Sequence, residues 1–325
     1  MSRLPILACV ISLALAGCGG ALGTDRPDQD ASLLLDFTPN GVHAGIYLAL
    51  ERDYDEAEGV TLSVKTPGAS TDALKLLESG RVDMAILDIH DLALAREHGA
   101  PIVGVMALVQ QPLAALLAQP DIKRPRQLEG KRAGVTGLPS DVAVLRSIVQ
   151  GDGGDPDKVK ATTIGFQAVK AMLAHRVDAA TAFWNVEGVA LKARRPDTHE
   201  FRVDQYGAPP YPELVLCTTR VTLDDERPLV RATVRALQRG YEETQADPES
   251  AVSALVQANP DIERDAAAAQ LDAVDPAFTA GAAYYGELRQ GVLEKWAAWD
   301  LKFGIVDKPI DVGRSFDFGL AQRYP

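Results

Sequence analysis

One transition from helix to strand occurs twice in this chain and limits what it can fold into. Residues 81–85 (RVDMA) and 176–180 (RVDAA) each connect a helical pattern to a short apolar run typical of a strand. Strands that alternate with helices are typical of a mostly parallel sheet flanked by helices. The chain has 325 residues, enough for two domains. We therefore predict two similarly built α/β lobes.

The strongest candidate for a ligand-binding edge is the segment 33–50, LLLDFTPNGVHAGIYLAL. A buried strand is expected at 33–35, a loop with a proline and a glycine at 36–41, and a helix at 43–52. This order presents loop side chains and the first amides of the helix together at the carboxyl end of a sheet. The combination suits a flat heteroaromatic ligand with polar edges. An aromatic ring, an amide, an imidazole and a phenol gather there, on Phe37, Asn40, His43 and Tyr47.

Local sequence leaves other roles open for two of these residues. A phenylalanine in a strand-to-helix loop also serves as a core plug, so Phe37 need not face a ligand. His43 stands where it could simply cap the helix.

A second group of aromatic and polar residues occurs at 183–188 (FWNVEG), where a predicted strand ends. Trp184 offers a stacking face, Asn185 an amide that can donate and accept, and Glu187 a carboxylate. A carboxylate that faces an amino group beside a ring nitrogen accepts strong, directional hydrogen bonds from the amino group. It also disfavours ligands without such donors, because its buried charge would stay unpaired. The alternative is that Glu187 lies on an exposed helix surface.

Both segments resemble motifs of one protein family. LDFTPNGVHAGIYLAL is similar to the opening motif of the periplasmic binding proteins for thiamin pyrimidine precursors, L-D/N-W-x-P-N-x-x-H-x-G-I/L-Y, with Phe37 in place of the tryptophan. Residues 184–188 resemble the W-N-x-E-G of these proteins, whose glutamate accepts hydrogen bonds from the aminopyrimidine edge. Residues 206–214 resemble their Y-G-x-P-x-Y-x-E-L. The similarity runs from about residue 33 to the C-terminal region.

The resemblance implies a two-lobed periplasmic-binding-protein fold of type II, in which each lobe is a mostly parallel α/β sheet flanked by helices and a two-segment hinge joins the lobes. We expect residues 33–112 to form the first part of lobe 1, 113–215 to form lobe 2, and 216–325 to return to lobe 1. A long amphipathic helix is predicted at 284–303, with Trp296 and Trp299 in the core.

The ligand site is expected on loops of both lobes. Asp88 and His90 follow a predicted strand, Ser140 precedes a predicted helix, and Tyr211 lies near the returning hinge. Alternatively, His90 is a buried structural histidine, Ser140 or Asp141 caps the helix, and Tyr211 packs between the lobes. The predicted ligand-binding residues are Phe37, Asn40, His43, Tyr47, Asp88, His90, Ser140, Trp184, Asn185, Glu187 and Tyr211.

An enzyme is the alternative to a binding protein. The related fungal hydroxymethylpyrimidine phosphate synthases carry K-A-M-I-H, with a lysine for pyridoxal phosphate, where this chain has ILDIH at 86–90. Ile86 cannot form a Schiff base. The synthases' cysteine-rich stretch is also missing, since only Cys217 lies near the corresponding place. No metal or nucleophile motif is present, so we expect no enzyme activity, no cofactor and no metal.

The first residues predict export and anchoring. One basic residue precedes an apolar run, and the small residues of LAGC lead to Cys18, as in a bacterial lipoprotein signal spanning 1–18. Cleavage before Cys18 and its acylation would anchor the chain on the outer face of the cytoplasmic membrane, with 19–32 as a flexible tether. An ordinary secretory signal is the alternative. Cys217 is then the one remaining cysteine and is predicted to be buried.

Composition limits the partners. The 33 basic and 45 acidic residues give a net charge of −12, which argues against nucleic-acid or anionic-membrane surfaces. We therefore predict a monomeric lipoprotein that closes over a small heteroaromatic ligand and delivers it to an ABC permease. The resemblance favours a thiamin-related pyrimidine. The alternatives are riboflavin or another flat heterocycle and, after these, nitrate or a sulfonate.

Overall fold

The computed structural model describes residues 29–68 and 72–323. The expected signal segment, Cys18 and residues 19–28 of the expected tether lie outside the described residues. Within the described part, no helix combines the length and apolar character needed to cross a membrane.

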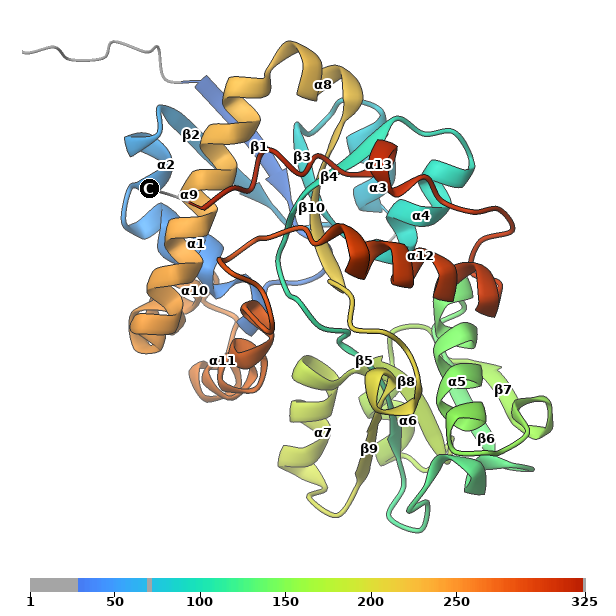
Figure 1. Cartoon of the computed structure of the whole chain (residues 1–325). Coiled ribbons are helices and arrows are strands. Elements are labelled where there is room, and N and C mark those ends of the chain that lie inside the picture. The colour runs from blue at the N-terminus through green and yellow to red at the C-terminus, as the bar shows by residue number, and fades with distance from the viewer. Residues whose placement is uncertain (1–28, 69–71, 324–325) are drawn as a thin grey trace, which may run out of the picture.

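Two five-stranded sheets organise two lobes (Figure 1). Lobe 1 has the strand order β2-β1-β3-β10-β4 and lobe 2 the order β7-β6-β8-β5-β9. β10 runs against β3 and β4, and β5 runs against β8 and β9, whereas β1 and β6 are parallel to both of their neighbours. The predicted two-lobed α/β fold is therefore confirmed, with one reversed strand in each sheet. The strands are β1 (Gln29–Leu34), β2 (Val60–Lys65), β3 (Met84–Asp88), β4 (Ile102–Ala107), β5 (Ala114–Ala118), β6 (Arg132–Val135), β7 (Lys160–Thr163), β8 (Ala179–Phe183), β9 (His199–Arg202) and β10 (Leu214–Thr219).

The chain passes from one sheet to the other between β4 and β5 and returns between β9 and β10. Since β10 already begins at Leu214, the lobe boundary expected after residue 215 falls inside this strand. Residues 29–32, expected in the tether, belong to β1 and pair in parallel with β2. Gln29 and Asp30 are exposed while Ala31 is buried, so the backbone pairing, more than apolar content, makes this segment a strand.

Alternation along the strands buries both faces of the lobe 1 sheet. On β3, Met84 and Ile86 pack into a cluster with side chains of α1 and α9, whereas Ala85 and Leu87 pack into a second cluster with side chains of α4 and α12. Burial on both faces explains why this strand is apolar throughout. The helices are η1 (Gly41–His43), α1 (Ala44–Glu51), α2 (Tyr54–Ala57), α3 (Asp72–Glu78), α4 (Ile89–Glu97), η2 (Pro125–Leu128), α5 (Pro139–Gly151), η3 (Pro156–Lys158), α6 (Ala168–Leu173), η4 (Trp184–Gly188), α7 (Val189–Arg194), η5 (Val203–Tyr206), α8 (Arg220–Asp225), α9 (Arg227–Ala246), α10 (Pro248–Ala258), α11 (Arg264–Phe278), α12 (Gln290–Phe303) and α13 (Val312–Ser315).

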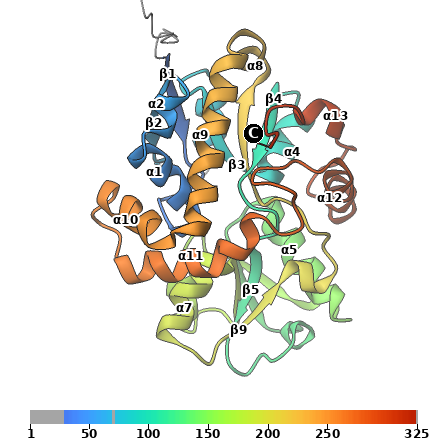
Figure 2. The same cartoon turned by 60° about the vertical axis from the view of Figure 1, so that its left-hand side comes forward.

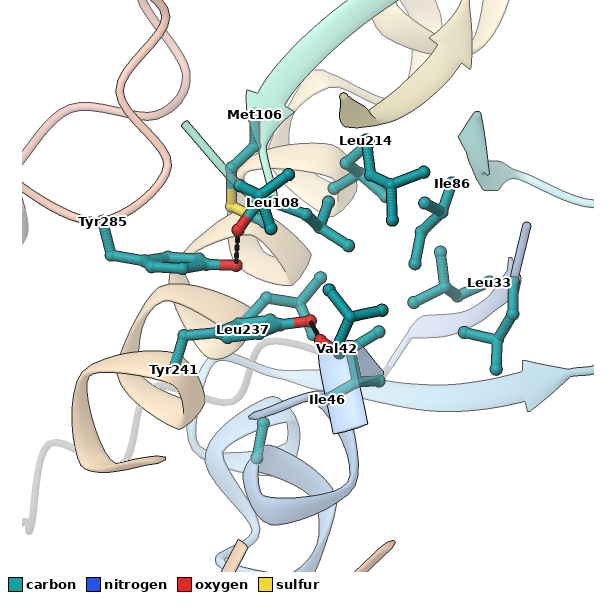
Figure 3. Packing of buried hydrophobic residues seen from close by; sticks show 14 of the residues in the cluster. Leu33, Val42, Ile46, Ile86, Met106, Leu108, Leu214, Leu237, Tyr241 and Tyr285 are labelled. Atoms are coloured by element: carbon teal, nitrogen blue, oxygen red, sulfur yellow. Dashed lines mark hydrogen bonds between the residues drawn. The ribbon is translucent and has the colours of Figure 1, made fainter. Parts of the chain in front are cut away.

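Two stacked tyrosines hold the segments that lead to the cleft between the lobes (Figure 3). The rings of Tyr241 and Tyr285 have centroids 4.3 Å apart and planes inclined by 10°. The hydroxyl of Tyr241 donates to the carbonyl of Val42, and that of Tyr285 donates to the carbonyl of Leu108, each at 2.8 Å. Val42 follows the first loop and Leu108 begins the crossing to lobe 2. The tyrosines therefore hold both segments against α9.

The helix expected at 284–303 is shorter than predicted, because α12 begins at Gln290. Gly286 has φ of +85°, a conformation that ends regular structure before the helix, and a side chain there would collide with Met106. Trp296 and Trp299 are buried, as predicted, and so is Cys217. The error arose because apolar spacing continued into a segment that packs without being helical.

Helices α1 and α9 lie side by side because glycines allow close contact (Figure 2). A Cβ atom at Gly240 would lie 2.2 Å from the carbonyl oxygen of Gly45. We expect Gly240→Ala to lower the free energy of unfolding by about 1–3 kcal/mol through overpacking, despite the better helix propensity of alanine. Urea unfolding measures this change.

Gly291→Ala is the matched control for Gly240→Ala, because a Cβ there meets no atom within 4 Å. This variant should leave stability unchanged or slightly raised. Equal stabilities of the two variants would show that the α1–α9 contact relaxes without cost.

Candidate functional site

A cavity lies in the cleft and takes its lining from both lobes; we call it the cleft cavity. Its volume is about 120 Å³. Pockets for drug-sized ligands measure about 300–1,000 Å³, so this cavity suits a smaller ligand of about one substituted ring. Six of the predicted ligand-binding residues line it: Phe37, Asn40, Asp88, Ser140, Asn185 and Glu187.

The aromatic part of the cleft cavity comes from two phenylalanines on different lobes. Phe37 follows β1, and Phe166 follows β7. Their ring centroids are 5.9 Å apart with planes inclined by 42°, and Phe166 is 50% exposed. Phe166 was not among the predicted ligand-binding residues, although it lies in a loop just after a strand, as several of them do.

The loop after β1 is held by a helix cap. The side-chain oxygen of Asn40 accepts a hydrogen bond from the amide of Val42 at 3.0 Å, and its Nδ2 donates to the carbonyl of Thr38 at 3.0 Å. Asn40 thus lines the cleft cavity with both polar side-chain atoms already engaged. The amide of Asn40 donates to Nδ1 of His43, so Nε2 of this histidine carries the proton and donates to Asp36 at 2.8 Å.

His43 is fully buried and does not line the cleft cavity, but its partner Asp36 does. The imidazole therefore orients a carboxylate at the cavity. His43 was expected to contact the ligand. The capping hydrogen bonds instead direct its ring behind the loop, so that it acts on the cleft cavity only through Asp36.

The segment WNVEG forms a single π-helical turn, η4, between β8 and α7. Such turns often occur at functional sites. Asn185 is fully buried, lines the cleft cavity, and has no hydrogen-bond partner on Oδ1 or Nδ2 among the described residues. Glu187 is half-buried, and its Oε2 accepts a hydrogen bond from the amide of Phe183 at 3.2 Å. One turn therefore offers an unpaired amide and a carboxylate to the same cavity.

Carboxyl groups dominate the electrostatics of the cleft cavity. Asp36, Asp88, Asp91, Asp141 and Glu187 line it, and its described lining includes no lysine, arginine or histidine. Burial raises the pKa of Asp88, Asp91, Asp141 and Glu187, since each charge has lost water. A cavity of this kind favours ligands that donate hydrogen bonds or carry positive charge.

Asp141 does not cap α5 as expected. The helix begins at Pro139, and the Asp141 carboxylate instead accepts hydrogen bonds from the amide of Thr136, at 2.7 Å, and from its hydroxyl. Proline at the first helical position needs no amide partner, so the helix forms without a side-chain cap. Asp141 was considered only as a cap, and Asp91 was overlooked although it lies three residues after Asp88 on the same helical face.

Tyr47, His90, Trp184 and Tyr211 are buried away from the cleft cavity. Tyr47 packs in the core of lobe 1. Trp184 donates from Nε1 to the carbonyl of Pro112 at 3.0 Å, and the guanidinium of Arg202 lies 3.8 Å above its ring. These four residues were expected to contact the ligand, but their rings pack in the hinge or the core and do not line the cleft cavity.

A buried network crosses the hinge behind the cleft cavity. His90 contacts Asp300 through Nδ1 at 3.0 Å and the hydroxyl of Tyr211 through Nε2 at 3.2 Å. Oε2 of Glu213, on the returning segment, accepts the amides of Leu113 and Ala114 on the outgoing segment at 2.6 and 3.0 Å. Glu213 thereby ties the two hinge segments together.

The donor atoms of Asp88, His90 and Glu213 lie within 4.8 Å of one another, a spacing compatible with metal binding. Both nitrogens of His90 and one carboxylate oxygen of Glu213 already have protein partners. The cluster therefore fits an ion-pair network better than a metal site.

Comparisons with known proteins agree with this architecture. A model of the NMT1/THI5-like family matches residues 40–251. The chain is 30% identical over 261 residues to the formylaminopyrimidine-binding protein of Halalkalibacterium halodurans, covering 79% of each chain. It is 27% identical over 241 residues to the 4-amino-5-hydroxymethyl-2-methylpyrimidine phosphate synthase of Legionella pneumophila, covering 71% of this chain and 74% of that protein. The solved periplasmic aliphatic sulphonate binding protein of Escherichia coli has a TM-score of 0.73 at 15% identity, covering 90% of this chain and 99% of that one.

Proposed function

The chain belongs to the NMT1/THI5-like family, and we propose that it is the substrate-binding component of an ABC-type importer for a thiamin-related pyrimidine precursor. This proposal rests on the presence of both Asn185 and Glu187 on one turn that faces the cleft cavity. An aminopyrimidine presents an N–H donor beside a ring-nitrogen acceptor. An amide and a carboxylate can bind both groups directly.

Size and charge argue against the other ligands. A cavity of about 120 Å³ suits one substituted ring better than the three fused rings of riboflavin. Nitrate and sulfonates are anions, and the cleft cavity offers them five carboxyl groups and no cationic side chain from its described lining. Like charges repel each other more strongly in a partly desolvated site than in water.

The synthase alternative is disfavoured by the floor of the cleft cavity. Ile86, which stands where the resembling synthases have their lysine, lines the cavity with an apolar side chain. No imine with pyridoxal phosphate can form at this position. The apolar side chain at this position supports a binding protein over a synthase that works through pyridoxal phosphate.

We further propose how the ligand is delivered to the membrane. The lobes close over the ligand by motion at the hinge that Glu213 bridges, and an ABC permease binds the closed monomer. Acylated Cys18 anchors the chain on the outer face of the cytoplasmic membrane.

Calorimetric titration of the purified protein with formylaminopyrimidine, hydroxymethylpyrimidine, thiamin, riboflavin and an alkanesulfonate tests the ligand class. We expect sub-micromolar binding of one pyrimidine and no binding of the sulfonate. Binding of the sulfonate or of riboflavin alone, or no heat with either pyrimidine, would contradict the assignment.

A further inference from the structure

The acidic residues of the cleft cavity come from both lobes. Asp88 caps α4 in lobe 1 and accepts the amide of His90 at 2.8 Å, and Asp91 lies in the first turn of the same helix. Asp141 on α5 and Glu187 on η4 belong to lobe 2. Closing the cleft therefore brings carboxylates of one lobe toward carboxylates of the other.

These groups lie close enough to interact. Burial is the main cause that raises the pKa of Asp91; the charge of His90 lowers this pKa, and the charge of Asp141 across the cleft raises it. The same Asp141 adds to the effect of burial in raising the pKa of Glu187. Like charges that meet in a partly desolvated space oppose closure unless an opposite charge enters between them.

One cation of the protein acts on these carboxyls. The charge of His90 lowers the pKa of Asp88, Asp91 and Asp141, but its ring is already engaged by Asp300 in the hinge network. His43 faces Asp36. Around the cleft carboxyls, the titratable groups of the packed elements are Asp36, His43, Asp88, His90, Asp91, Asp141, Glu187, Glu213 and Asp300.

An independent observation points to a ligand at the same place. Asn185 is fully buried, with neither its carbonyl oxygen nor its amino group paired. An unpaired buried amide is destabilising, and a bound partner with one donor and one acceptor would satisfy it. The acidic residues of the cleft cavity and the unpaired amide of Asn185 therefore favour a ligand with hydrogen-bonding groups at one edge and a positive net charge.

We infer that the cleft closes only when positive charge enters with the ligand, carried by a cationic heterocycle or taken up as a proton together with a neutral one. This inference rests on the proposed function for the identity of the heterocycle but not for the role of charge. A neutral aminopyrimidine would bind with a proton on its ring nitrogen or on a cleft carboxyl. The described lining of the cleft cavity offers an anionic ligand no cationic side chain.

Small-angle X-ray scattering of the ligand-free protein tests the charge barrier without any ligand. The radius of gyration should fall as the pH is lowered from 8 to 5, because protonated carboxyls no longer repel. The double variant Asp91→Asn/Asp141→Asn should already be compact at pH 8. Asp157→Asn, which removes an exposed charge from lobe 2, is the control and should behave as the wild type.

Calorimetry in buffers of different ionisation enthalpy gives the second measurement. Close to one proton should be taken up per pyrimidine bound above the ligand's own pKa, with Kd rising about tenfold per pH unit. For a pyrimidine that is neutral in solution, proton uptake of zero with a Kd independent of pH would overturn the inference. So would a radius of gyration that responds to neither pH nor the double variant. If no pyrimidine binds, the proposed function fails, and the scattering experiment still decides the role of charge.

Discussion

Replacing Glu187 by glutamine is expected to weaken pyrimidine binding by about 10- to 140-fold. A hydrogen bond to a charged group contributes about 1.5–3 kcal/mol, and each 1.4 kcal/mol is a tenfold change in Kd. The amide oxygen of glutamine can still accept the amide of Phe183, so η4 should keep its shape. The loss would therefore report on the missing carboxylate. Calorimetric titration with the pyrimidine that binds the wild type measures it.

The matched control for Glu187→Gln is Glu249→Gln on α10, where the side chain is 78% exposed and pairs with Arg264. This change removes the same charge far from the cleft and should leave Kd unaltered. An unchanged Kd in Glu187→Gln would show that the carboxylate serves only the backbone of its own turn.

Replacing His90 by alanine is expected to lower the free energy of unfolding by about 3–5 kcal/mol, the usual cost of removing one partner from a buried ion pair. Asp300 and Glu213 are essentially inaccessible to solvent, and His90 is the cation between them. Without it, their charges stay unpaired in the core. Urea unfolding at neutral pH measures the loss, with the exposed His98→Ala as the control.

The pH dependence of this difference follows from the His90 pKa. Burial alone lowers the pKa of His90, but Asp300, Asp88 and Glu213 outweigh it and raise the pKa from 6.5 to about 10. Because the folded-state pKa is the higher one, the stabilisation is complete below pH 6.5 and is lost as the pH rises toward 10. The difference in the free energy of unfolding between wild type and His90→Ala should therefore decrease as the pH rises from 6.5 to 10. A gap that stays constant would mean that His90 is neutral in the folded protein.

The local order of the chain was predictable because it depends on nearby residues. The apolar run of β3 and the loop after β1 follow from side chains that are neighbours in sequence. The errors occurred where neighbours were insufficient. The helix expected at 284–303 begins only at Gln290. Tyr285 lies before it and stacks on Tyr241, a residue distant in the chain, which local sequence could not indicate.

The candidate site divides in the same way. Asn185 and Glu187 could be chosen from the sequence because both belong to one short segment, whereas the contact of Phe37 with Phe166 and the approach of Asp91 to Asp141 join different lobes. Trp184 and Tyr211 carry the right chemistry in sequence, yet their rings turn into the hinge to contact Arg202 and His90.

The two α/β lobes, the family resemblance and the polar segment at 184–188 could be predicted from the sequence, since period, composition and motif are local properties. The set of side chains that share the cleft cavity could not, nor could a described lining that contains acids without a cationic side chain, because both depend on contacts between distant segments. The direction of a side chain at a strand end depends on the packing behind it. The meeting of the lobes depends on contacts between segments far apart in the chain, such as α12 with α5.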